Sequence, residues 1–144
     1  MTLALDFGFR HDEPRGGAET KYSLKGAPQG AVAELIQWAN SQSVPVLALD
    51  VPSGVDATSG RVFDPAIRAT ATMTLALPKE GLNKLAMESY VGELYLADIS
   101  VPPGLYARPP LNIHIAPLFA CEEVFRLRLA ASGLGATATR CGSS

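Results

Sequence analysis

Val44-Pro-Val-Leu-Ala-Leu-Asp-Val-Pro-Ser-Gly-Val-Asp56 is the stretch that decides the fold of this chain. Its first six residues form a short apolar run without alternation, which is typical of a parallel strand buried on both faces of a sheet. The run ends at Asp50, and the turn residues Pro52 and Gly54 follow. The segment therefore predicts a buried strand with a carboxylate at its carboxyl end.

A helix is expected immediately before this strand. Helical spacing begins after Gln29, continues for about twelve residues and closes at Asn40 and Ser41, because Pro45 prevents its continuation. Trp38 lies beside the predicted apolar face. The residues of that face recur at i, i+3, i+4 and i+7, and they are Val32, Leu35, Ile36 and Ala39.

Further strands are expected after the central run. Residues 73–77 and 93–99 are short apolar segments that end at prolines or just before them, whereas residues 123–128 alternate as an edge strand does. Apolar strands that follow a helix predict an α/β fold with a mainly parallel sheet. We find no internal repeat.

Length and composition exclude several classes of protein. The chain has 144 residues, the size of one domain, with 47% hydrophobic and 18% charged residues. Its net charge of −2 offers no basic surface for nucleic acid, and no segment approaches the roughly 18 apolar residues of a membrane span. Cys121 and Cys141 lack metal-ligand spacing, and neither His11 nor His114 has a ligand or nucleophile nearby. A soluble cytoplasmic protein is expected.

Three polar segments are candidates for a site. Asp50 lies where ligands bind in open α/β sheets, although a carboxylate that only caps its own turn has the same pattern. The loop 22–28 leads into the helix, so backbone N–H groups and Lys25 could hold an anion, or the loop could be a simple helix entry. Lys79 follows the second apolar strand and could contact a phosphate, pair with Glu80 or lie in solvent.

The order of these segments resembles the NAD(P)H-hydrate epimerase family, also called the YjeF N-terminal domain family. The resemblance covers a little over half of the chain, and its most specific parts are the Leu-Asp-Val-Pro-Ser-Gly stretch and the later Leu-Pro-Lys. Four segments carry it: Tyr22-Ser-Leu-Lys-Gly-Ala-Pro-Gln-Gly30, Leu49-Asp-Val-Pro-Ser-Gly-Val-Asp56, Thr72-Met-Thr-Leu-Ala-Leu-Pro-Lys-Glu-Gly-Leu82, and Gly92-Glu-Leu-Tyr-Leu-Ala-Asp-Ile99 with Val101-Pro-Pro103.

The resemblance implies a Rossmann-like three-layer αβα sandwich and an isomerase. Such enzymes interconvert the R and S epimers of hydrated NADH and NADPH, bind a potassium ion, act with an NAD(P)H-hydrate dehydratase and form homodimers. By position, Asp50 would be the catalytic, substrate-contacting aspartate, and Ser53 would bind the potassium ion. The loop that would line the substrate is Lys21, Tyr22, Ser23, Leu24, Lys25, Gly26 and Ala27.

The front of the family's domain is not found in this sequence. The family's Asn-Asn-Gly-Gly-Asp loop has no counterpart, and in the family's Asp-Ala-x-x-Gly segment Gly17 replaces the aspartate and Lys21 the glycine; Thr70 is a milder departure. We therefore divide the chain into a divergent or disordered segment 1–21, the C-terminal part of an epimerase domain 22–129 and a flexible tail 130–144.

Two other functions are compatible with this division. The fold could serve as a non-catalytic module that binds another protein through an exposed sheet edge. It could also belong to another nucleotide-binding α/β enzyme such as a kinase, but the sequence holds no phosphate-donor loop. An incomplete domain is also expected to have lower activity.

Overall fold

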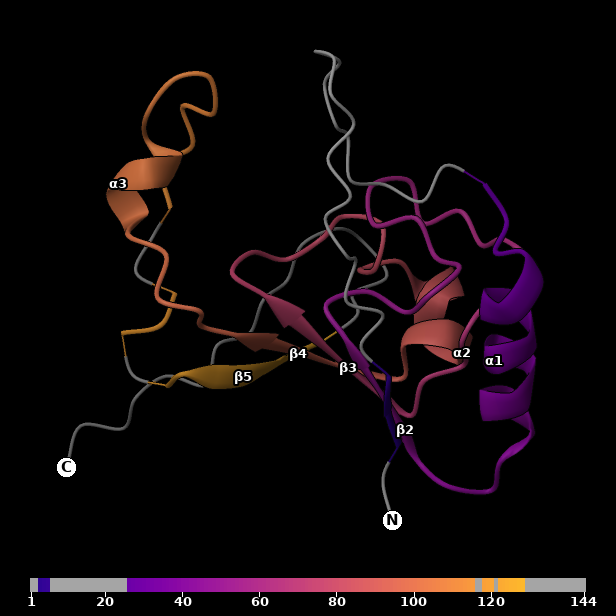
Figure 1. Cartoon of the computed structure of the whole chain (residues 1–144). Helices are drawn as coiled ribbons and strands as arrows, with labels where there is room; N and C mark the ends of the chain where they lie inside the picture. The colour runs from indigo at the N-terminus through magenta and orange to yellow at the C-terminus, as the bar shows by residue number, and fades with distance from the viewer. Residues whose placement is uncertain (1–2, 6–25, 116–117, 121, 129–144) are drawn as a thin grey trace, which may run out of the picture.

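The computed structural model describes residues 3–5, 26–115, 118–120 and 122–128 (Figure 1). Predictions for 6–25 and 129–144, including the flexible tail and most of the substrate loop, lie outside the described residues. The elements in chain order are β1 (Leu3–Leu5), α1 (Gly30–Ser41), β2 (Val46–Leu49), β3 (Ala71–Leu75), the 3₁₀ helix η1 (Leu85–Met87), α2 (Glu88–Val91), β4 (Glu93–Ala97), α3 (Pro103–Tyr106) and β5 (Val124–Leu127).

Five strands form one sheet in the order β1-β2-β3-β4-β5. The first four are parallel, with Leu47 opposite Ala71 and Ala71 opposite Glu93, and β5 joins antiparallel at the edge. The predicted α/β fold with a mainly parallel sheet is therefore confirmed. The sequence did not predict β1, because three residues are too few for a periodic signal.

One face of the sheet is covered by helices and forms the core. Figure 1 shows α1 and α2 on the same side of the sheet, and Thr72 within the covered face donates a 2.7 Å hydrogen bond to the Val91 carbonyl of α2. One cluster of buried side chains lies where α1 packs on the sheet, and it comprises Ile36, Ala39, Val46, Ala48, Ile67 and Ala69. A second cluster, to which η1, α2, β4 and β5 contribute, comprises Leu82, Met87, Val91, Leu94, Leu96, Phe125 and Leu127.

The opposite face of the sheet, which we call the open face, carries the alternate side chains of the same strands. No helix among the described residues packs on it, so these residues supply two of the three expected layers. Leu49 is 40% exposed, so the prediction that its strand is buried on both faces is wrong for the last residue of β2. The open face consists of Leu47, Leu49, Ala71, Met73, Leu75, Glu93, Tyr95, Ala97, Val124 and Arg126.

Helix α1 has the predicted length, but two of the four residues on its predicted apolar face are exposed and not buried. Ile36 and Ala39 are fully buried, whereas Val32 is 36% and Leu35 46% exposed, like the neighbouring Trp38 at 52%. Helical spacing shows which residues share a face, but burial requires a neighbouring element on that side. The described part of the chain supplies α1 with only one narrow contact surface.

None of the helices in the described ranges is long and apolar enough to span a membrane.

Candidate site at the carboxyl ends of the strands

Asp50 follows β2 and lies at the centre of a strained three-residue turn. Its φ is 64°, the Val51 N–H donates to the Leu49 carbonyl at 2.9 Å, and the Asp50 N–H donates to the Met73 carbonyl of β3 at 2.8 Å. A non-glycine residue at positive φ costs on the order of 1–3 kcal/mol, and such strain gathers at functional sites. The neighbouring strand ends alike, with Ala76 at φ 63°.

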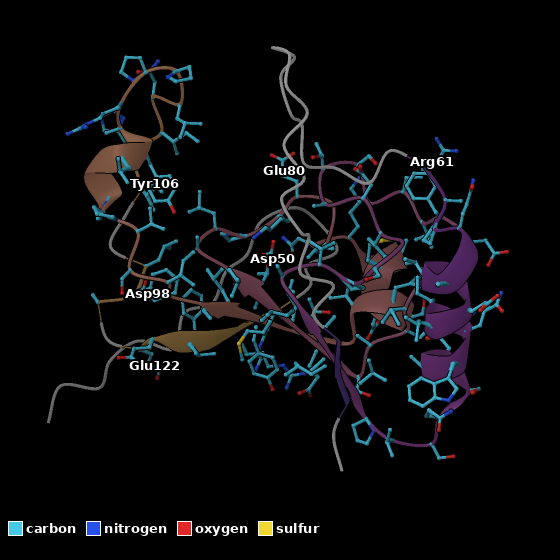
Figure 2. All side chains as sticks on the ribbon, in the orientation of Figure 1. Asp50, Arg61, Glu80, Asp98, Tyr106 and Glu122 are labelled. Atoms are coloured by element: carbon cyan, nitrogen blue, oxygen red, sulfur yellow. The ribbon has the colours of Figure 1, made fainter. Side chains whose placement is uncertain are left out.

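The Asp50 carboxylate is held by the strand beside it rather than by its own turn. Its Oδ1 accepts from the Lys79 Nζ at 2.5 Å, from the Leu75 N–H at 3.1 Å and, more weakly, from the Thr74 hydroxyl at 3.5 Å. Among the described residues no donor reaches Oδ2. Since the side chain is 45% exposed, this oxygen can meet a ligand. Figure 2 shows Asp50 at this edge with Glu80 on the loop above it.

The turn-capping role that was the alternative for Asp50 belongs to Asp56. Its Oδ1 accepts from the Ser59 N–H at 2.6 Å, the Ser59 hydroxyl at 2.7 Å and the Thr58 N–H at 3.1 Å. These hydrogen bonds, those from Ser59 first, lower the pKa of Asp56 below its ordinary value of 3.8. Asp56 is thus a structural residue of the loop that follows β2.

Lys79 is the residue that sequence reasoning undervalued. It lies four residues after the end of β3, and its side chain is only 24% exposed. Besides the Asp50 carboxylate, its Nζ donates to the Leu75 carbonyl at 2.8 Å. It forms no ion pair with Glu80 among the described residues. The signal that could have found it is the parallel arrangement itself, which places the ends of adjacent strands side by side.

The loops that carry Asp50 and Lys79 dock on each other through glycines. The Gly81 N–H donates to the Ala57 carbonyl at 2.9 Å, and a Cβ built on Gly81 would lie 2.5 Å from that same oxygen. A Cβ on Gly60 would lie 2.6 Å from the Gly81 carbonyl. Only glycine allows this close approach, so both loops are fixed over the sheet edge.

Ser53, the predicted metal ligand, is half-buried one turn beyond Asp50. Its carbonyl accepts from the Ile67 N–H at 2.8 Å, and its hydroxyl has no hydrogen-bond partner among the described residues. The following Gly54 has φ 89°, and a Cβ there would lie 2.6 Å from the Pro65 carbonyl. The Pro-Ser-Gly sequence is thus explained first by turn geometry.

Of the predicted substrate loop, Gly26 and Ala27 are within the described residues and Lys21 to Lys25 are not. Gly26 is half-buried with φ 122°, and Ala27 is exposed. Both lie just before α1, which runs antiparallel to β2 and so begins at the carboxyl edge of the sheet. The structure thus brings these two residues to the same edge as Asp50, and no hydrogen bond joins them to it among the described residues.

A hollow of about 390 Å³ opens at the ends of β3 and β4, one strand beyond Asp50. It begins at Ala76 and Leu77, and Figure 2 shows Asp98 and Tyr106 on its far side. Asp50 is not among its lining residues. Its size suits a small ligand, and its mainly apolar lining was not predicted from the sequence.

A mainly parallel sheet with a strained, half-exposed carboxylate at its carboxyl edge defines a Rossmann-like α/β domain with a candidate site at the strand ends. The profile of the family described as "YjeF-related protein N-terminus" matches residues 7–81, just over half of the chain. The chain belongs to this family. The match begins inside the segment 1–21, which was predicted to be divergent or disordered, and it includes Asp50, Ser53 and Lys79.

Curated relatives agree with this assignment. The chain is 46% identical over 99 residues to "NAD(P)H-hydrate epimerase" of Dehalogenimonas lykanthroporepellens, covering 69% of this chain and 39% of the relative. It is 38% identical over 112 residues to "Bifunctional NAD(P)H-hydrate repair enzyme Nnr" of Moorella thermoacetica, covering 78% of this chain and 21% of the relative. The chain thus spans well under half the length of these proteins.

A solved structure supports the fold. The protein described as "Crystal structure of yeast ynu0, YNL200c" aligns with a TM-score of 0.51 at 15% identity, covering 72% of this chain and 42% of that chain. At this identity the likeness concerns the fold alone.

Proposed function

We propose that this chain carries part of the active site of an NAD(P)H-hydrate epimerase, an isomerase of nucleotide repair. The names of its relatives support this proposal. The observation that carries it is the position of Asp50, whose carboxylate is held through one oxygen at the carboxyl edge while the other has no donor among the described residues. An oriented carboxylate at that edge is what the reaction requires.

The proposed reaction requires a group that stabilises a transient positive charge on the nicotinamide ring. When the C6–O bond of hydrated NADH or NADPH breaks, its electron pair leaves with the oxygen as water, and the ring nitrogen lone pair forms an iminium-like cation. The Asp50 carboxylate stabilises this charge electrostatically. One proton is taken up as water leaves and one is released as water adds to the other face, so a single carboxyl group can relay it.

The remaining site residues belong to the same proposal. The loop 21–27 and Asp50 would contact the hydrated nucleotide, and Ser53 would contribute a hydroxyl oxygen to a potassium ion. No group of three or more His, Cys, Asp or Glu that could hold a metal lies among the described residues, and one hydroxyl is not a ligand set. We therefore assign no step to the ion in this chain.

Partners follow from the same chemistry. Conversion of the R epimer to the S epimer repairs the nucleotide only if a second activity dehydrates the S epimer. The Moorella thermoacetica relative is named a bifunctional NAD(P)H-hydrate repair enzyme. An NAD(P)H-hydrate dehydratase is the functional partner that we propose. A homodimer and a cytoplasmic location complete the proposal.

The test is an assay with mixed hydrated NADH epimers and an S-specific dehydratase in excess. The chain is expected to accelerate consumption of the R epimer above its spontaneous rate, and Asp50→Asn is expected to lower that rate at least about a hundredfold, since general acid–base groups contribute about 10²–10⁴. Circular dichroism of both proteins controls for folding. An Asp50→Asn rate within a factor of two of the parent would contradict the role of Asp50.

A non-catalytic interaction module is the second candidate, and the open face of the sheet favours it. Apolar side chains such as Leu49 and Val124 are 40% and 42% exposed there, as in surfaces that another protein covers. Calorimetry with NADP⁺ distinguishes the two functions. The module is supported if the chain neither accelerates epimerisation nor binds the nucleotide.

A further inference from the structure

We infer that Lys79 is a positioning residue, which clamps one oxygen of Asp50 and leaves the other free for the substrate. This inference rests on the proposed function for its consequence in catalysis, but its geometry stands on the structure. The juxtaposition joins two loops that follow adjacent strands, β2 and β3, and no pattern within either loop predicts it.

Lys79 is held both at its ammonium group and by the loop that carries it. Its Nζ lies 2.5 Å from Asp50 Oδ1 and 2.8 Å from the Leu75 carbonyl oxygen. With 24% of the side chain exposed, most of the aliphatic stem is covered, and the Gly81–Ala57 contact anchors its loop. An exposed surface ion pair between two mobile side chains would lack this second acceptor and this anchored loop.

The clamp selects one carboxylate oxygen. All three donors, from Thr74, Leu75 and Lys79, converge on Oδ1, and none among the described residues reaches Oδ2. The Leu75 N–H lies in β3 and the Lys79 ammonium lies on the loop after it. Because these two donors approach Oδ1 from separate points, together they fix the direction of the carboxyl plane. The backbone conformation at Asp50 fixes the position of its Cβ, and the hydrogen bond from Lys79 fixes the position of its Oδ1.

Removing the Lys79 ammonium leaves only the Leu75 N–H and the weaker Thr74 hydroxyl on Oδ1, so the Asp50 side chain gains freedom to rotate while its carboxylate is kept. A misplaced catalytic group lowers the rate of the chemical step, while substrate contacts elsewhere are kept. Lys79→Met should lower kcat at least about tenfold and leave KM within about threefold. Lys79→Arg keeps a cation at the same place and should restore most of the rate. A purely structural lysine would show no such division between kcat and KM.

The kinetic experiment compares the parent chain with Lys79→Met, Lys79→Arg and the control Glu80→Gln in the coupled epimer assay. Glu80 is the exposed neighbour of Lys79 and makes no side-chain hydrogen bond among the described residues, so its variant should match the parent. Circular dichroism and urea unfolding of each variant separate loss of fold from loss of rate. A Lys79→Met variant with the parent's kcat overturns the inference and leaves the proposed function standing.

A second measurement does not depend on activity. Acetylation by an N-hydroxysuccinimide ester, followed by mass spectrometry, reports the reactivity of Lys79 against Lys84. Lys84 contacts the Ser59 carbonyl and not Asp50. In Asp50→Asn the reactivity of Lys79 relative to Lys84 should rise at least about threefold, because charge-assisted hydrogen bonds are about twice as strong as neutral ones. An unchanged ratio overturns the clamp, even if the parent chain proves inactive and the proposed function fails.

Discussion

Asp50 and Asp56 lie six positions apart in the same loop and have opposite roles. The Asp50 side chain reaches across to β3 and keeps one oxygen unpaired among the described residues, whereas the Asp56 side chain closes its own turn. Both carboxylates follow the same apolar strand. Their difference arises from the backbone, because φ of 64° at Asp50 directs its side chain toward the neighbouring strand.

Asp56 makes a testable contribution to pH-dependent stability. Its folded pKa is lowered from 3.8, chiefly by the hydrogen bond from the Ser59 N–H, so its stabilisation is complete above the unfolded pKa and is lost as pH falls through the folded one. Asp56→Asn cannot titrate. Between about pH 5 and about pH 3 the parent should lose more unfolding free energy than this variant, as measured by urea unfolding. Parallel pH profiles would show that the turn is absent in solution.

Replacement of Gly54 by alanine tests why the Pro-Ser-Gly turn requires a glycine. Its φ of 89° and the 2.6 Å between a built Cβ and the Pro65 carbonyl mean that Gly54→Ala strains the backbone and forces two loops apart. We expect a loss of about 2–4 kcal/mol in unfolding free energy.

Gly104 supplies the matched control for this change. It lies in α3, and a Cβ there meets nothing within 4 Å. Gly104→Ala should therefore be neutral or raise the unfolding free energy by up to about 1 kcal/mol. Equal losses for the two alanine variants in guanidinium unfolding would contradict the close approach at Gly54.

The elements differ in how far their sequences determined them. Helix α1 begins and ends as its spacing predicts, and three of the strands coincide with the apolar runs, although β3 begins two residues before the predicted segment. The short elements η1, α2 and α3 were not predicted, because three or four residues cannot display a period of 3.6. Burial on α1 was predicted only in part, since it depends on which elements lie beside the helix.

Two adjacent residues of α1 test this pattern of burial. Ile36 is fully buried, whereas Leu35 is 46% exposed. Ile36→Ala should lower the unfolding free energy by about 2–4 kcal/mol, and Leu35→Ala by less than about 1 kcal/mol. Thermal unfolding of both variants measures the difference. Similar costs at the two positions would mean that a further part of the molecule covers Leu35.

At the scale of the whole molecule, the described residues cover only one of the two faces of the sheet. The open face combines apolar side chains such as Leu49, Met73 and Val124 with few charges. Exposed apolar surfaces of this kind associate. The chain should therefore self-associate at micromolar concentration, in line with the proposed homodimer.

Val124→Lys places a charge on the open face and should weaken self-association at least about tenfold, which is 1.4 kcal/mol. Glu122→Gln changes the net charge by the same amount just before β5 and should leave association unchanged. Sedimentation velocity over a range of concentrations measures both variants. Equal association of parent and Val124→Lys would place the contact elsewhere.

The sequence by itself determined the local features of this protein: a helix, three apolar strands, an edge strand and a carboxylate at the end of one strand. These follow from periodicity and turn chemistry, which act over a few neighbouring residues. Only the tertiary structure decided that Lys79 meets Asp50, that Leu35 is exposed and that one face of the sheet is open. Such features depend on which segments, distant in the chain, become neighbours when parallel strands align.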